Sequence, residues 1–456
     1  MQIRTPQYVA KIIKKLQDNG YEAYAVGGCV RDSILGEEPN DWDVTTNALP
    51  QQVKALFRRT VDIGIEHGTV KVMTGNDGVE ITTYRIDGEY EDSRHPKEVT
   101  FTADLAEDLK RRDFTINAMA YSESTGLIDL FGGEDDLRGG IIRAVGDPSE
   151  RFSEDALRIL RALRFSARFK YDIEEETKKA MVALAPTLSK ISAERIREEL
   201  EKIIVSDNPD RLRWAYIFGV TKVFLPEWDS MMECKQTTPH HFTDVGDHTI
   251  VAMEYIVSHY GDIPKEERRI LGIATLLHDI AKPVMKTTGP DGIDHFKGHP
   301  EKGEDMAVAV LQRLKYDNDT IRRVRKLVRY HDERPELSYP SVRRFIGNVG
   351  VSNMDDLMRL KYADLYAHAK YLWDDKLFQV EKLDEMYKKI REDGDPLEIK
   401  DLAVGGEDLI REGIPAGPLL GEKLRYLLDK VLDDPSLNEK EKLIACLPKD
   451  HMNEKH

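Results

Sequence analysis

The stretch Tyr21–Thr46, YEAYAVGGCVRDSILGEEPNDWDVTT, decides how the first part of the chain folds. Its opening apolar run has the length of a buried strand, and the pair Gly27–Gly28 then ends that run. From Val30 onward the residues suit the start of a helix. A strand that turns through glycines into a helix presents free backbone N–H groups, which suits a phosphate. Arg31 adds guanidinium donors beside this turn.

Two carboxylates, Asp41 and Asp43, follow with one residue between them. If they begin a second strand, both side chains lie on one face, roughly 6–7 Å apart, because side chains alternate with period two. Mg²⁺ prefers carboxylates together with substrate phosphates. A glycine pair alone is usually a turn, and an isolated DxD is usually a solvated strand end. The ordered combination nevertheless predicts a site for a nucleoside triphosphate and Mg²⁺.

This combination, GG-x-VRD followed by D-x-D-V-T-T, resembles the nucleotidyltransferase head of the class II CCA-adding enzymes and of the related bacterial poly(A) polymerases. The resemblance implies that Gly28 and Arg31 contact the nucleotide. It also implies that Asp41 and Asp43 hold the catalytic metal.

Composition limits the protein class. The chain has 456 residues, 40% of them hydrophobic and 33% charged, which predicts a soluble globular protein with several domains. No apolar run approaches membrane-spanning length, and no signal region is expected. Three widely spaced cysteines give no disulfide framework, so we expect a cytoplasmic protein. The net charge of −16 argues against a general nucleic-acid binder and leaves room for a local basic surface.

The segment after the head stretch predicts two strands, one of which carries Glu80. This residue is a candidate third carboxylate for the metal, and an edge-strand salt bridge is the alternative. The polar segment Tyr84–Thr102 predicts a long loop, and loops of this length tend to be functional. It resembles the flexible loop of CCA-adding enzymes, which the family links to the final adenosine step, and therefore favours full CCA addition.

The octet RRDFTINA, residues 111–118, is a further strong signature of the same family. Arg112 can reach a triphosphate, and Asp113 can accept a hydrogen bond from a ribose hydroxyl. The alternative is a structural ion pair.

An all-helical region is expected from Arg151–Lys170, with Asp155 and Arg158 on one face at spacing i, i+3. The plain interpretation is an intrahelical salt bridge worth a few tenths of a kcal/mol. The functional interpretation is base selection: a carboxylate beside a guanidinium matches the amino donor and ring acceptor of C and A, and repels G and U. The family resemblance assigns this role to EDxxR, and implies that Arg161 and Arg164 continue towards the triphosphate.

A second group of candidate ligands lies in the later half of the chain. An HD doublet, His278–Asp279, has His248 upstream and Asp364 downstream. Imidazole and carboxylate ligands suit a divalent metal. A structural histidine cluster is the alternative. The set resembles the HD phosphohydrolase superfamily, which implies that these four residues bind a divalent metal of unknown identity, that Lys282 binds phosphate, and that His299 and His331 complete a second site or assist proton transfer.

The predicted fold class is α+β: a small mixed-sheet nucleotidyltransferase head at 1–150, a helical neck and body at 151–230, a helical HD domain at 231–370, and a helical tail at 371–456 that contacts tRNA. The predicted activity is template-independent addition of C, C and A to a tRNA 3′ end from CTP and ATP, with Mg²⁺, plus a phosphohydrolase. An A-adding enzyme or poly(A) polymerase, a catalytically dead tRNA- or nucleotide-binding protein, and an HD phosphohydrolase with a merely nucleotide-binding head remain alternatives.

Overall fold

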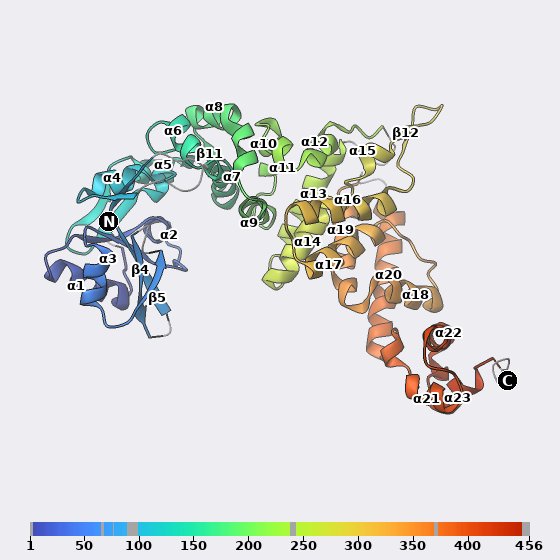
Figure 1. The fold of residues 1–456 in the computed structure, drawn as a ribbon. Coiled ribbons are helices and arrows are strands. Elements are labelled where there is room, and N and C mark those ends of the chain that lie inside the picture. Colours follow the sequence, from blue (N-terminus) through green and yellow to red (C-terminus); the bar gives the residue numbers. More distant parts are fainter. Residues whose placement is uncertain are drawn as a thin grey trace. The chain divides into compact units, whose positions relative to one another are not determined.

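The computed structural model describes residues 3–64, 68–75, 77–88, 99–237, 243–368 and 373–448. The chain divides into two compact units, Met1–Asp229 and Ser230–His456 (Figure 1). No helix among the described residues is long and apolar enough to cross a membrane.

The first unit is built around a mixed seven-stranded sheet, which confirms the predicted α+β head. Strands β2 and β5 pair in parallel, and the remaining neighbours pair antiparallel. The sheet order is β3 (Thr60–Gly64), β4 (Thr69–Thr74), β5 (Asp77–Thr83), β2 (Asp43–Thr46), β1 (Ala23–Val26), β8 (Met119–Ser122) and β9 (Gly126–Asp129).

The diglycine turn joins β1 to the short helix α2 (Gly28–Ile34). Gly27 has φ +81°, a left-handed conformation that side chains rarely adopt, so glycine is needed there. The surrounding helices of the head are α1 (Gln7–Asp18), α3 (Pro50–Leu56), α4 (Leu105–Lys110) and α5 (Gly133–Gly139).

The segment predicted as one long loop, Tyr84–Thr102, is paired at its base. Strands β6 (Arg85–Asp87) and β7 (Val99–Phe101) form an antiparallel ribbon. Residues 89–98, the middle of that loop, lie outside the described residues. The prediction of a loop was therefore wrong at both ends, where backbone pairing replaces irregular structure.

The segment Arg151–Lys170, predicted to be helical with Asp155 and Arg158 on one helix face, is divided between two helices, α6 (Pro148–Glu154) and α7 (Leu157–Phe169). Asp155 separates them in an extended conformation, with φ −138° and ψ 102°. Its carboxylate accepts a hydrogen bond from the backbone N–H of Leu157, 3.0 Å away, as an N-terminal cap does. The first unit continues through β10 (Ile141–Ile142), β11 (Asp172–Ile173), α8 (Glu175–Leu184), α9 (Ala193–Ile204), α10 (Arg211–Ile217), α11 (Thr221–Phe224) and α12 (Pro226–Glu233), the last of which crosses the unit boundary.

The second unit is helical apart from one two-stranded ribbon, as far as its described residues go. Helix α13 packs against both α14 and α19, which brings three distant parts of the sequence together. The elements are α13 (Val245–Tyr260), α14 (Lys265–Leu277), α15 (Lys282–Met285), β12 (Thr287–Thr288), β13 (Asp294–His295), α16 (His299–Arg313), α17 (Asn318–Tyr330), α18 (Tyr339–Val349), α19 (Met354–Tyr366), α20 (Trp373–Asp393), α21 (Gly406–Arg411), α22 (Pro418–Asp433) and α23 (Lys440–Ala445).

Candidate active site and candidate metal centre

Three carboxylates gather where β2 begins. Asp41 and Asp43 are exposed and Trp42 between them is buried, so the two carboxylates share a face. Glu80 lies directly opposite Asp43 in the β2–β5 register. Glu80 also pairs with Lys71, 3.6 Å away, so the salt-bridge alternative is present in the structure. Asp41 and Asp43 form no ion pair with another described side chain, which leaves their oxygens available to a cation.

The electrostatics around Asp43 favour a cation. Partial burial raises the pKa of this carboxyl, Arg112 lowers it, and the negative charges of Glu80 and Asp41 raise it again; the net shift is upward. Mutual repulsion of this kind is relieved when a metal ion binds. The residues present therefore fit Mg²⁺.

Arg112 lies against the diglycine turn. Its Nη1 atom is 2.9 Å from the position that a Cβ atom on Gly27 would occupy. Its Nε atom is buried and has no hydrogen-bond partner. Since a buried, unsatisfied donor is costly, this guanidinium has unused capacity for an anion beside the turn.

Three other arginines predicted to touch the nucleotide have partners of their own. Arg31 is buried beneath Gly28, donates to Asp32 (2.8 Å) and Asn117, and stacks on Phe165 and Phe169. The Asp113 carboxylate accepts from Arg161 Nε at 2.8 Å and from Asn117 at 3.0 Å.

Arg164 pairs with Glu199 on α9, with 3.1 Å between Nε and Oε2. Burial lowers the pKa of Arg164 to about 10, and the nearby Arg161 adds to that effect. Burial raises the pKa of Asp113, but Arg161 and the Asn117 hydrogen bond outweigh it, so the pKa falls well below its usual range. Asp113 thus holds Arg161 in place here.

The expected salt bridge between Asp155 and Arg158 is absent from the described contacts. Asp155 pairs with Arg195 on α9 at 2.7 Å, and Arg158 pairs with Glu154 at 2.6 Å. The break between α6 and α7 explains this, because the two residues no longer share one helix. Arg158 also donates to the carbonyl of Arg111 at 2.8 Å, which joins the selecting segment to the RRDFTINA segment.

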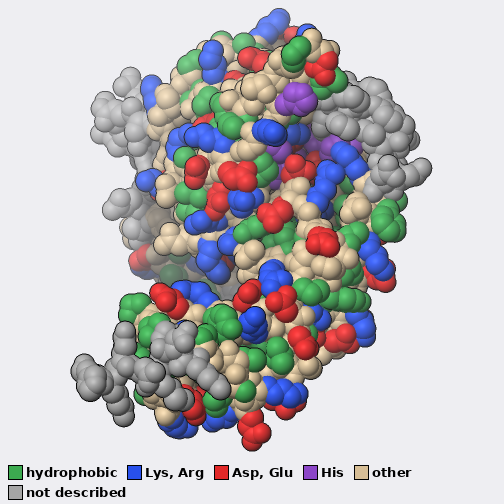
Figure 2. Space-filling view, turned by 90° about the vertical axis from the view of Figure 1, so that its right-hand side faces the viewer, with side chains coloured by type: hydrophobic (Ala, Val, Ile, Leu, Met, Phe, Trp, Pro, Cys, Tyr) green, Lys and Arg blue, Asp and Glu red, His purple; other side chains and the backbone are tan. Residues whose placement is uncertain are grey.

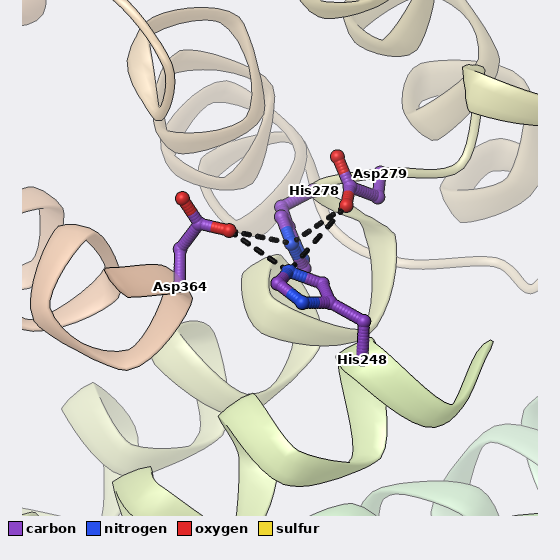
Figure 3. A group of neighbouring side chains, drawn as sticks. All are labelled: His248, His278, Asp279 and Asp364. Carbon is purple, nitrogen blue, oxygen red and sulfur yellow. Dashed lines mark hydrogen bonds and ion pairs between the residues drawn. The ribbon is translucent and has the colours of Figure 1, made fainter. Parts of the chain in front are cut away.

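In the second unit, the four ligands predicted from the HD doublet come together (Figure 3). His248 comes from α13, His278 and Asp279 follow α14, and Asp364 comes from α19. His248 Nε2 lies 2.9 Å from Asp364 Oδ1, and His278 Nε2 lies 3.2 Å from Asp279 Oδ2. One ligand atom from each of the four residues lies within 4.8 Å of the others.

A second possible ligand group shares Asp279. His299 Nε2 and His331 Nε2 lie 3.4 and 3.6 Å from Asp279 Oδ1. Together these three residues form another group within the same 4.8 Å limit. Asp279 thus presents one oxygen to each group.

The histidine rings are fixed in the orientation that metal ligands need. Each Nδ1 faces a backbone carbonyl to which it can donate, so Nε2 is the ring nitrogen that is turned towards the other ligand candidates. The partners are Ala367 for His248 (3.2 Å), Thr275 for His278 (2.7 Å), Phe296 for His299 (2.9 Å) and Val328 for His331 (2.7 Å).

Orphaned polar atoms support a cation at this centre. Among the described residues, His278 Nε2 and both carboxylate oxygens of Asp279 are buried and make no well-directed hydrogen bond, although each has an ion-pair contact. Lys282 Nζ is 2.7 Å from Asp279 Oδ2 and donates to Gln236, so this predicted phosphate ligand also neutralises Asp279. A divalent ion would satisfy the remaining atoms.

A cavity of about 360 Å³ opens beside this centre. Its walls include metal-ligand candidates and basic side chains. Figure 2 shows histidines with lysines and arginines beside them on one face of the molecule. The basic side chains are Lys282, Lys297, Arg334 and Lys376.

Comparisons with known proteins show what the chain is similar to. Family models match three successive parts of the chain: the Poly A polymerase head domain over 23–143, the "Probable RNA and SrmB- binding site of polymerase A" over 170–232, and tRNA nucleotidyltransferase domain 2 over 301–447. The CCA-adding enzyme of Leuconostoc mesenteroides is 48% identical over 227 residues, 49% of this chain and 57% of the relative. That of Limosilactobacillus reuteri is 52% identical over 198 residues, 43% of this chain and 49% of the relative.

The chain is similar to CCA-adding enzymes. It is similar to the Bacillus stearothermophilus CCA-adding enzyme solved with CTP, with TM-score 0.72, 28% identity and 97% of both chains covered. It is also similar to the Thermotoga maritima CCA-adding enzyme complexed with tRNA, with TM-score 0.58, 25% identity, and 97% of this chain and 98% of that chain covered. The chain spans about half the length of the curated relatives it matches.

Two buried carboxylates that pair with arginines of the first unit were not among the residues predicted from the sequence. Glu199 holds Arg164, and Asp108 pairs with Arg111 and Arg112. Asp108 lies three and four residues before its arginines on the end of α4, so the helical i, i+3 and i, i+4 spacing was a usable signal.

Proposed function

We propose that the chain adds C, C and A to the 3′ end of tRNA, using CTP and ATP and releasing pyrophosphate. One observation carries the proposal: the carboxylates Asp41 and Asp43, which form no ion pair with any described residue, share a face at the start of β2, and Arg112 lies against the diglycine turn that precedes it. Similarity to CCA-adding enzymes supports the proposal, including relatives whose structures hold CTP or tRNA.

The residues divide the chemical work between them. Mg²⁺ held by Asp41 and Asp43 would favour ionisation of the 3′-hydroxyl and stabilise charge on the departing pyrophosphate. Arg112 orients the triphosphate at the diglycine turn. Asp155 accepts from the amino group of C or A and Arg158 donates to the ring nitrogen, so G and U are rejected. In the present contacts both selecting residues have protein partners, so base binding exchanges those partners.

The deciding experiment uses tRNA that lacks its CCA end. It is incubated with CTP alone, ATP alone and both together, and the products are sized. CCA addition gives two added nucleotides with CTP and three with both. Addition of A alone would indicate an A-adding enzyme or a poly(A) polymerase. No addition would indicate a catalytically dead tRNA- or nucleotide-binding protein, or an HD phosphohydrolase whose head only binds nucleotide.

Asp41→Ala tests the metal assignment in the same assay. Since the variant removes one of two ligands, addition of both C and A should be lost. Substantial activity in Asp41→Ala at saturating Mg²⁺ would remove the carboxylate pair from the mechanism.

We also propose a metal-dependent phosphohydrolase in the second unit. The observation that favours it is the convergence of four ligand atoms beside a cavity whose walls carry both basic and acidic side chains. The bound ion would activate water for attack on a phosphoester. The chain's own contribution is to hold the phosphate with Lys282 and its basic neighbours, and to fix each histidine through its carbonyl partner.

The test compares the wild-type chain with His278→Ala on a 2′,3′-cyclic nucleotide and on 2′- and 3′-nucleotides, with Mn²⁺, Ni²⁺ or Mg²⁺ added after chelation. Hydrolysis should depend on metal and disappear in the variant, while nucleotide addition continues. A wild-type chain that binds metal but hydrolyses none of these esters would contradict the proposal.

A further inference from the structure

A fully buried carboxylate, Asp108, connects several parts of the head. Its side chain has no exposed area. Oδ1 accepts from Arg111 Nη2 at 2.8 Å and from the backbone N–H of Arg85 at 3.4 Å. Oδ2 accepts from the hydroxyl of Thr45 at 3.0 Å and lies 3.8 Å from Arg112 Nη2.

Three of these partners lie in different segments of the head. Thr45 lies on β2, two residues after Asp43. Arg85 begins β6, at the base of the ribbon that bounds residues 89–98. Arg112 reaches the diglycine turn, where its other terminal nitrogen approaches Gly27.

A fourth connection runs through the backbone. Arg158 donates to the carbonyl of Arg111 at 2.8 Å, and Arg151 donates to the carbonyl of Lys110 at 3.1 Å. The end of α4 that Asp108 stabilises is therefore also the place where the base-selecting segment attaches.

We propose that Asp108 is a positioning residue for nucleotide addition: it holds Arg112 at the diglycine turn and ties that arginine to β2, to the ribbon and to the base-selecting segment. The inference rests on the proposed nucleotide addition. Charge-assisted hydrogen bonds in a buried network are stronger than hydrogen bonds between neutral groups. Removing the charge of Asp108 therefore weakens the contacts that hold both Arg111 and Arg112. The position of Arg112 then varies, and the triphosphate loses a fixed contact.

The test is Asp108→Asn, which keeps the size of the side chain and removes its charge. We expect kcat/KM for CTP and ATP to fall by roughly 10- to 100-fold, the range for losing a hydrogen bond to a charged group. The fall should appear in kcat and in the KM for nucleotide, with the KM for tRNA unchanged. The value of kcat/KM for ATP should fall further than that for CTP, because the backbone N–H of Arg85, at the base of the β6–β7 ribbon, loses its charged acceptor. Asp108→Glu, which keeps the charge, should recover part of the loss.

A matched control separates positioning from stability. Asp136 is another buried carboxylate of the head; it accepts from the Thr115 hydroxyl at 2.6 Å and from Arg143 at 3.1 Å, and it has no described contact with Arg112. Asp136→Asn should lower the melting temperature and leave the KM for nucleotide unchanged. If Asp108→Asn does not fold, Thr45→Val removes one contact of the network and should still raise the KM for nucleotide.

The outcomes separate the two claims. Absence of CCA addition by the wild-type chain contradicts the proposed function. If the wild-type chain adds CCA and both Asp108→Asn and Thr45→Val keep kcat/KM for nucleotide within twofold of the wild-type value, the positioning role is contradicted. It is also contradicted if Asp136→Asn lowers kcat/KM as much as Asp108→Asn does.

Discussion

A guanidinium orients a phosphate only when its neighbours hold it still. The sequence predicted arginines near the nucleotide, but it could not show that Arg31 and Arg161 would be engaged by acidic or amide partners. Asp32 is adjacent to Arg31, whereas Asn117 and Asp113 are distant in sequence from the arginines that they hold, so those two pairings depend on the folded sheet and helices. Arg112 is held by Asp108, and its buried Nε atom makes no hydrogen bond to a described residue.

Gly27→Ala tests the diglycine turn at this scale. The added Cβ would lie 2.9 Å from Arg112 Nη1, and φ +81° is unfavourable for alanine by roughly 1–2 kcal/mol. We expect a lower melting temperature and about a tenfold higher KM for CTP and ATP, as for one lost charged contact. Gly126→Ala, at φ +81° with open space around it, is the control and should change stability alone.

Cys29 provides a pH-dependent prediction. Burial raises the pKa of this thiol from 9.0 to about 11, although hydrogen bonds to the backbone of Asp43 and Val26 lower it in part. Between these values the unfolded chain releases a proton that the folded chain keeps, so the free energy of unfolding falls as pH rises from about 9 to about 11. The drop in the urea midpoint from pH 8.5 to pH 10.5 should be larger for the wild-type chain and Cys446→Ser than for Cys29→Ser. An equal drop in all three would exclude Cys29 as the source.

At the scale of elements, the sequence indicated the strand, turn and helix of the head correctly, because apolar runs and glycines act locally. It did not indicate the break between α6 and α7. Leu157, Leu160 and Leu163 keep helical spacing through that region. The interruption depends on Asp155 capping α7 and pairing with Arg195, a residue 40 positions away.

Arg195→Ala tests whether this pairing matters for base choice. Asp155 would lose the partner that sets its direction, so discrimination against GTP and UTP should weaken by roughly tenfold, the value of one charge-assisted hydrogen bond. Misincorporation is measured with each nucleotide alone on tRNA ending in CC. Arg213→Ala, an arginine paired with Asp210 on α10, is the control. Unchanged discrimination in Arg195→Ala would show that Asp155 is oriented without it.

At the scale of the whole molecule, the chain divides into two compact units with separate candidate sites. The motifs of both were recognisable from sequence, since HD and D-x-D patterns are short and local. Three of the carbonyls that orient the histidines lie three residues before their histidine, but the sequence could not provide the fourth, because the carbonyl that faces His248 belongs to Ala367, 119 positions away.

Metal binding should therefore stabilise the second unit selectively. A ligand at 100 times its Kd adds about 2.7 kcal/mol to the free energy of unfolding. In a unit of this size this raises the melting temperature by roughly 5–10 °C. Calorimetry of the chelated chain, with and without Mn²⁺, should move one transition and leave the other in place. In Asp279→Asn the shift should vanish. A shift of both transitions, or one that persists in the variant, would contradict an independent metal centre.

The single carboxylate of Asp279, which presents one oxygen to each histidine group, would make two ion positions at this centre dependent on each other. A first ion would reduce the negative charge available to a second ion, and it would at the same time hold the Asp279 side chain in one orientation. These two effects oppose each other, so a metal titration would show two binding steps with different affinities. The concentration of free metal would then decide how many ions the centre carries.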